Sequence, residues 1–225
     1  MTRSAGISAV SLAFVLALPA FVASQRLNAR AESPPQPAPS MSFFVTSVGR
    51  GFGGNLGGLR GADAHCQQLA AAAGAGSRSW RAYLSAPATR DAPAVQARAR
   101  IGTGPWFNAN GVLIAESLPA LHDGPNELGS EHSLTEKGTS VAPGRHDILT
   151  GSNPDGTLAG DGTSDTTCGG WTSHDGGRAM LGHHNRSGGG ARPASWNSAH
   201  LSRGCSQTAL RASLGDGLIY CFAAD

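Results

Sequence analysis

Apolar and polar positions divide the chain into short elements separated by long polar stretches. Residues 61–73 (GADAHCQQLAAAA) carry apolar side chains three and four positions apart, which predicts a helix that ends at Gly74. Residues 80–85 (WRAYLS) alternate apolar and polar side chains, the pattern of a half-buried strand. The aromatic and β-branched run at 42–47 predicts a first strand, and the apolar run at 218–222 predicts a buried terminal strand.

Weaker signals lie between these elements. The pair Asn110-Gly111 sits between apolar runs, and Asn-Gly is the strongest two-residue signal for the turn of a β-hairpin. We also expect a short helix within 92–99 and short strands at 166–173 and 179–182. Short strands, about two helices and long loops together predict an α+β fold.

The N-terminus has the pattern of an export signal. A predominantly apolar run of fifteen residues covers 9–23, the right length for the core of a signal peptide and too short for a membrane span. We assign residues 1–31 to a signal peptide cleaved after Ala31; cleavage after residue 23 and an uncleaved anchor are the alternatives. The proline-rich residues 32–41 form a linker, and the folded domain covers 42–225. The mature chain is then secreted or periplasmic and carries no membrane span.

Composition narrows the classes further. Glycine supplies 32 of the 225 residues and charged residues only 14%, which excludes a coiled coil and a highly charged disordered chain. The net charge of +2 comes from 17 basic and 15 acidic residues, and three of the arginines lie in the predicted signal peptide. The remaining chain has no basic excess, so we expect no nucleic-acid partner.

The chain has four cysteines, and an even number behind an export signal predicts two disulfides. Spacing alone leaves all three pairings open. Zinc binding by cysteine is a poor alternative because the sequence contains no C-x-x-C pair.

Several of these residues occur together in one known family. The segment 58–63 (GLRGAD), Cys66 and the strand at 80–85 resemble the opening of endostatin-like domains, which have the C-type-lectin-like fold. Further along, the same order continues through residues 151–156 (GSNPDG), Cys168, Trp171, Cys205 and Cys221. The chain is also similar to bacterial exported proteins described as lectins, through Trp196-Asn197 and the two cysteines that follow. The resemblance implies short antiparallel strands and nested disulfides, Cys66–Cys221 and Cys168–Cys205.

The resemblance also implies a binding domain whose partners are glycans or surface glycoconjugates. Sugars bind to planar hydrogen-bonding side chains beside an aromatic face, and four residues near the C-terminus offer these groups: Trp196, Asn197, His200 and Asn185. Packing in the core is the alternative role for Trp196. A protein- or cell-surface-interaction module with no sugar or calcium site is the alternative function. The sequence carries no pattern that sets an oligomeric state.

The family's calcium site is incomplete in this chain. Its Trp-Asn-Asp motif here is Trp196-Asn197-Ser198, which removes one anionic ligand, so we expect no cofactor. Three aspartates, Asp155, Asp161 and Asp165, are the candidates for a calcium site of another kind, although their spacing does not fit an EF-hand.

Zinc and catalysis find little support in the sequence. The adjacent His183-His184 pair points to opposite faces of a strand, and the N-terminal histidines through which animal endostatins bind zinc are missing. The chain contains no G-x-S-x-G, H-E-x-x-H or P-loop motif, so we expect no enzyme activity and no catalytic residues.

Overall fold

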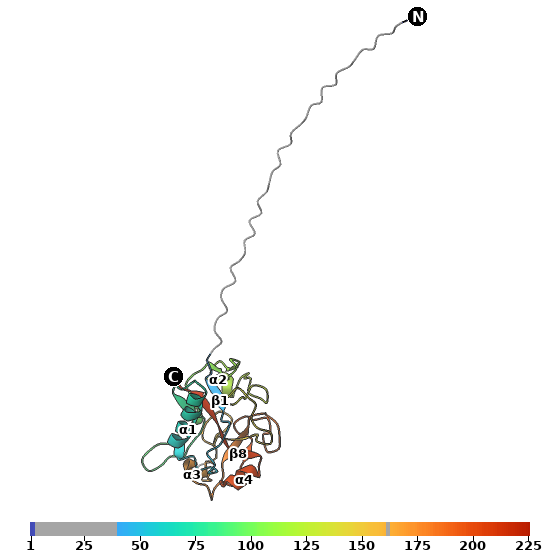
Figure 1. The fold of residues 1–225 in the computed structure, drawn as a ribbon. Helices are drawn as coiled ribbons and strands as arrows, with labels where there is room; N and C mark the ends of the chain where they lie inside the picture. The colour runs from blue at the N-terminus through green and yellow to red at the C-terminus, as the bar shows by residue number, and fades with distance from the viewer. Residues whose placement is uncertain (3–39, 161–162) are drawn as a thin grey trace. The chain divides into compact units, whose positions relative to one another are not determined.

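The computed structural model describes residues 1–2, 40–160 and 163–225. The predicted signal peptide and linker therefore lie almost entirely outside the described residues. The described chain has an α+β fold with four α-helices, two β-sheets and two disulfides (Figure 1). None of its helices is long and apolar enough to cross a membrane.

The C-terminal strand β8 (Gly215–Ala223) is the centre of the larger sheet, and all nine of its residues are buried. Phe222 pairs with Phe43 of β1 (Phe43–Val45) and also with Arg81 of β2 (Trp80–Ala82), so these two strands flank β8 on opposite edges. The predicted terminal strand is confirmed, and it is longer than its apolar run.

The rest of this sheet extends from the N-terminal half of β8. β5 (Asp147–Leu149) pairs with β8, β6 (Met180–His183) with β5, and β7 (His200–Leu201) with β6. The β5–β8 pairing is parallel, whereas antiparallel strands were expected. The predicted hairpin forms the second sheet, from β3 (Trp106–Phe107) and β4 (Leu113–Ala115).

The predicted long helix is confirmed as α1 (Gly58–Ala72). Two short helices were not predicted, α2 (Leu118–His122) and α4 (Gln207–Arg211). The helix expected within 92–99 is wrong: only a single 3₁₀ turn forms there, at Ala97–Ala99. The strand expected at 166–173 is also wrong, because Cys168–Trp171 forms the short helix α3, with positive φ at all four of its residues.

Two hydrophobic clusters cover the two faces of the sheet. Along β8, Ile219 and Cys221 enter one cluster, and Tyr220 and Phe222 enter the other. This alternation follows from the two-residue period of a strand. The chain has a core on each side of its central strand, so β8 is buried on both faces.

The disulfides are Cys66–Cys221 and Cys168–Cys205, the nested pairing that the resemblance implied. The outer bridge joins α1 to β8 inside the first cluster. The inner bridge joins α3 to the loop before α4. All four cysteines are bonded, so no free thiol remains.

Candidate functional site

Neighbouring strands bring together a buried aspartate and three histidines. Asp147 opens β5 and lies directly opposite His183 in the register of β5 with β6. His146 immediately precedes Asp147 in the chain. His200 opens β7, which pairs with β6 on its other side. Residues separated by more than fifty positions therefore meet at one end of the sheet.

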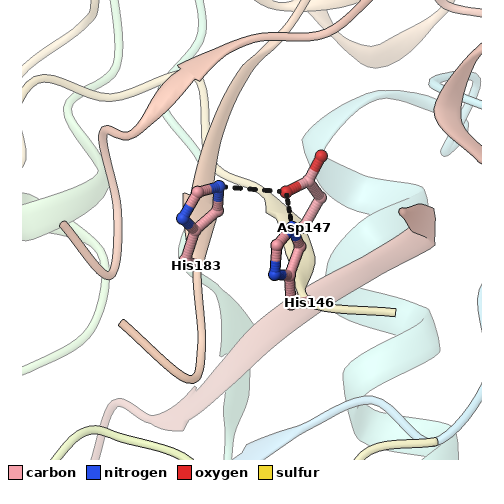
Figure 2. A group of neighbouring side chains, drawn as sticks. All are labelled: His146, Asp147 and His183. Atoms are coloured by element: carbon pink, nitrogen blue, oxygen red, sulfur yellow. Dashed lines mark ion pairs between the residues drawn. The ribbon is translucent and has the colours of Figure 1, made fainter. Parts of the chain in front are cut away.

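The three imidazole rings converge on one oxygen. The Nε2 atoms of His146 and His183 both lie 3.2 Å from Asp147 Oδ1, and Figure 2 marks these two ion pairs with dashed lines. The Nε2 atom of His200 lies 3.5 Å from the same oxygen. The side chains of Asp147 and His183 are fully buried, whereas those of His146 and His200 are 16% and 23% exposed. The cluster therefore has a closed floor and a partly open side.

Short distances do not make these contacts hydrogen bonds. Asp147 Oδ1 and Oδ2 and His183 Nε2 are buried and have no hydrogen-bond partner within the described chain. Burial raises the pKa of the Asp147 carboxyl group, and the three histidines and the Ser213 side chain oppose that rise, while burial lowers the pKa of His146. A buried carboxylate with no well-aligned hydrogen bond is a costly arrangement, and it marks the cluster as a functional candidate.

Backbone carbonyls fix the tautomer of two of the rings. His183 Nδ1 lies 2.8 Å from Pro193 O, and His200 Nδ1 lies 3.0 Å from Leu201 O. A carbonyl oxygen only accepts, so each Nδ1 must carry the hydrogen and donate it. In the neutral form of each ring, the bare Nε2 lone pair then faces Asp147.

A glycine loop covers the rings. A Cβ atom at Gly188 would lie 2.5 Å from His146 Cε1 and 3.3 Å from His183 Cε1. A Cβ atom at Gly190 would lie 2.8 Å from His200 Cδ2. Both glycines have positive φ, 120° and 104°. The loop approaches the cluster closely because it has no side chains at these positions.

The cluster lies at the wall of a pocket of about 490 Å³. Its lining combines polar and apolar groups, contributed by His146, the glycine loop 188–190, His200, Leu201, Arg203 and residues 212–214. A cavity of about 520 Å³ lies elsewhere, beside the end of α1; its lining combines alanines, Leu69 and Gly138 with Asn110, Glu136 and Lys137 and includes no histidine. The pocket beside His146 and His200 combines concavity with the buried histidine–aspartate cluster.

Of the residues expected to bind sugar, the structure places Trp196 in the core. Its side chain is 4% exposed and packs against Tyr83, Tyr220 and His122, with ring centroids 4.7, 5.3 and 5.8 Å away. An indole enclosed in this way has no open face for a sugar ring.

Asn197 is also buried, at 1% exposed, and its amide is fully occupied. Its Nδ2 lies 2.9 Å from Tyr83 Oη, 3.1 Å from Asn153 O and 3.0 Å from Pro154 O. Its Oδ1 accepts a hydrogen bond from Ser195 Oγ. The residue ties three segments together, which is a structural role.

The other two expected residues are accessible. His200 joins the histidine cluster and lines its pocket. Asn185 is half-buried, and its Oδ1 accepts a hydrogen bond from Ser187 N, which leads into the glycine loop. The structure thus separates the expected set into a buried pair and an accessible pair.

Asp155 and Asp165, the two calcium candidates within the described residues, do not belong to a group of converging ligand atoms. Asp161 lies outside the described residues. Asp155 Oδ1 accepts from Thr157 N and Oγ1, and these hydrogen bonds lower the pKa of Asp155. Asp165 caps its own loop, accepting from Thr167 N and Gly169 N. Each carboxylate is used locally, in a turn or a helix start.

Within the described residues, the group with converging metal-ligand atoms is instead His146, Asp147 and His183, whose ligand atoms lie within 4.8 Å of one another. Sequence reasoning missed the first two. Its available signal was a His-Asp pair at the start of one strand and a histidine at the end of another, and only strand pairing joins them. No protein-family model matches the chain, and no curated protein matches it.

Proposed function

We propose that this chain is an exported, non-enzymatic binding domain of the C-type-lectin-like fold and that its ligand is a carbohydrate. The nested bridges Cys66–Cys221 and Cys168–Cys205 support the fold, because they are the pairing that the resemblance implies. The function rests on one observation, the pocket beside His200, which is one of the two accessible residues of the expected sugar-binding set.

The pocket has the mixed chemistry that a sugar requires. Arg203 is exposed at its wall, and His200 and Ser213 supply further polar groups. Leu201 and Leu214 supply apolar surface, and the Leu214 side chain is 51% exposed. Ligand sites are typically concave, with few polar groups set in apolar walls, and about 490 Å³ lies within their usual range of roughly 300–1,000 Å³. Since Trp196 is enclosed, the apolar side of the sugar ring would rest on the leucines of the pocket wall.

The test is a glycan array probed with the purified, oxidised chain, with and without EDTA. Arg203→Ala removes a cationic donor from the pocket wall without touching the core. Arg60→Ala is the matched control, because it removes an exposed arginine from the remote helix α1. We expect selective glycan binding that falls at least tenfold in Arg203→Ala and is unchanged in Arg60→Ala.

Two results would overturn this proposal. Absence of binding to any glycan in both conditions removes carbohydrate as the ligand and favours the protein- or surface-interaction alternative. Equal loss of binding in both arginine variants places the ligand outside this pocket.

A further inference from the structure

We infer that His146, Asp147, His183 and His200 form a binding site for one divalent transition-metal ion, with Zn²⁺ the best match. This inference goes beyond the proposed function and stands without it, because it depends on the geometry of the cluster alone. It also reverses the expectation from sequence, which found little support for zinc because the adjacent His183-His184 pair points to opposite faces of a strand.

The spacing around Asp147 Oδ1 is that of neighbouring ligands on one ion. His146, Asp147 and His183 form the converging set, with ligand atoms within 4.8 Å of one another, and His200 approaches that set through Asp147. Ligands at zinc's usual bond lengths of ~2.0–2.2 Å lie roughly 3.3–3.5 Å from one another at tetrahedral angles. The three Nε2 atoms lie 3.2, 3.2 and 3.5 Å from Asp147 Oδ1. An ion placed among four such atoms attracts each lone pair toward a common centre rather than toward a neighbouring ligand. Short nitrogen–oxygen distances without hydrogen-bond alignment, the state of His183 and Asp147, are what this arrangement produces.

The tautomers support the same conclusion. His183 and His200 each donate Nδ1–H to a carbonyl oxygen, at 2.8 and 3.0 Å. Histidines that bind metals through Nε2 almost always hold their second nitrogen in this way, which fixes the ring and raises its basicity. Without a cation or an added proton on Asp147 or a ring, two neutral rings would direct bare lone pairs at a buried carboxylate, so acceptor would face acceptor.

Charge compensation leads to the same ion. The Asp147 side chain is fully buried, and none of the described Lys or Arg residues forms an ion pair with it. One divalent cation neutralises the carboxylate without requiring several imidazolium rings to crowd around one oxygen. Three imidazole nitrogens and one carboxylate oxygen suit zinc and its neighbours among the transition metals, whereas calcium takes six to eight oxygen ligands.

The surroundings leave the cluster open on one side and covered on another. His146 and His200 line the pocket, so an ion can reach the cluster from that side. Gly188 and Gly190 cover the rings at distances that leave no room for a side chain. The buried pair Asp147 and His183 forms the floor, and the exposed pair completes the coordination.

The experiment titrates the EDTA-stripped, oxidised chain with zinc chloride alone. Isothermal titration and elemental analysis after equilibrium dialysis give the stoichiometry, and the visible spectrum of the Co²⁺-loaded chain distinguishes four-coordinate from six-coordinate metal. We expect one ion per chain and a four-coordinate cobalt spectrum. We also expect thermal stability that rises with zinc concentration, as mass action requires.

Asp147→Asn keeps the size of the floor residue and removes its charge. His146→Ala and His200→Ala act at the partly exposed side, so they test the site even where the buried variant fails to fold. Each should weaken zinc binding by at least ~100-fold, since loss of an outer-shell partner already costs ~10–100-fold. His174→Ala is the control, because that side chain is 60% exposed and is not part of the cluster. The zinc affinity of this variant should match that of the wild-type chain.

The site is absent if the wild-type chain binds no stoichiometric zinc; the cluster is then a set of buried ion pairs. The inference also fails if the His146→Ala and His200→Ala variants bind zinc as tightly as His174→Ala. Because no glycan enters this titration, a failed glycan array leaves the metal site standing, and a failed titration leaves the carbohydrate proposal standing.

Discussion

Asn197 offers the sharpest separation between a structural and a ligand-binding role. Its Nδ2 carries two hydrogens and faces three oxygens, at 2.9, 3.1 and 3.0 Å. One of these belongs to Tyr83, whose hydroxyl is itself buried and lies 2.8 Å from His122 Nε2. Burial raises the pKa of Tyr83, so the hydroxyl keeps its proton and accepts from Asn197 while it donates to His122. The amide therefore completes a hydrogen-bonded chain from Asn197 through Tyr83 to His122, beside the hydrophobic cluster that contains Tyr220 and Phe222.

Asn197→Ala removes the donor and leaves its acceptors without a partner. An unpaired buried group costs about 1–3 kcal/mol, and two donated bonds are lost. The carbonyl of Pro154 belongs to an exposed residue, so water recovers part of that loss. We expect the free energy of unfolding to fall by about 2–3 kcal/mol, a large share of the ~5–15 kcal/mol typical of a folded domain. Asn197→Asp should cost more, because a carboxylate would face the same three oxygens with no hydrogen to donate.

The assay is guanidinium unfolding at neutral pH with the disulfides intact, followed by tryptophan fluorescence. Asn185→Ala is the matched control: the same residue type, half-buried, with one local hydrogen bond to Ser187 N. Its effect should stay within about 0.5 kcal/mol, as for most surface changes. If Asn197→Ala is as stable as the control, the hydrogen-bonded chain contributes nothing. If that stable variant also loses glycan binding, Asn197 is a ligand contact and the structural role is wrong.

Three further predictions follow from local geometry. Replacing Cys66 and Cys221 together by alanine removes the bridge that closes a loop of 155 residues, and it should lower the free energy of unfolding by about 5 kcal/mol. Removing the inner bridge, which closes 37 residues, should cost about 4 kcal/mol. Equal losses in chemical unfolding would contradict the loop-closure argument. Gly182→Ala places a Cβ atom 1.7 Å from Trp196 O, so it should lower unfolding stability by at least ~3 kcal/mol or prevent folding, and a stable variant would disprove that close approach. Burial lowers the pKa of His122, so the stability that the neutral ring contributes is complete above the ordinary pKa near 6.5 and is lost as pH falls through the folded-state pKa. Unfolding curves measured across this pH range should show a smaller loss of stability on acidification for His122→Gln than for wild type.

The sequence predicted a helix or strand correctly where the residues of that element alone carried the signal. The helix at 61–73 was visible because alanine, leucine and a terminal glycine act within a few residues, and α1 covers nearly that range. The strands at 80–85 and 218–222 were visible through alternation or a continuous apolar run. The short helices α2 and α4 were missed, although Ser117 and Ser206 cap them as serine commonly does.

The strand prediction for residues 166–173 was wrong because tertiary contacts decide the path of this segment. Its threonines and tryptophan favour a strand, but the backbone turns at Cys168 to meet Cys205, with Gly169 and Gly170 in the left-handed region. Trp171 is consequently fully buried, and its Nε1 donates to Ser85 O. Propensity is a weak signal where a covalent bridge and a buried side chain decide the path.

The sequence by itself determined the elements with strong local periodicity and the even cysteine count, and it predicted a signal segment ahead of a glycine-rich domain. Only the tertiary structure decided which polar residues share a site. Asp147 and His183 meet because β5 pairs with β6 in one register, and His200 joins them because β7 pairs with the other edge of β6. A shift of one residue in either pairing would turn these side chains to the opposite face. Register is set by the burial of whole strands, and no local motif records it.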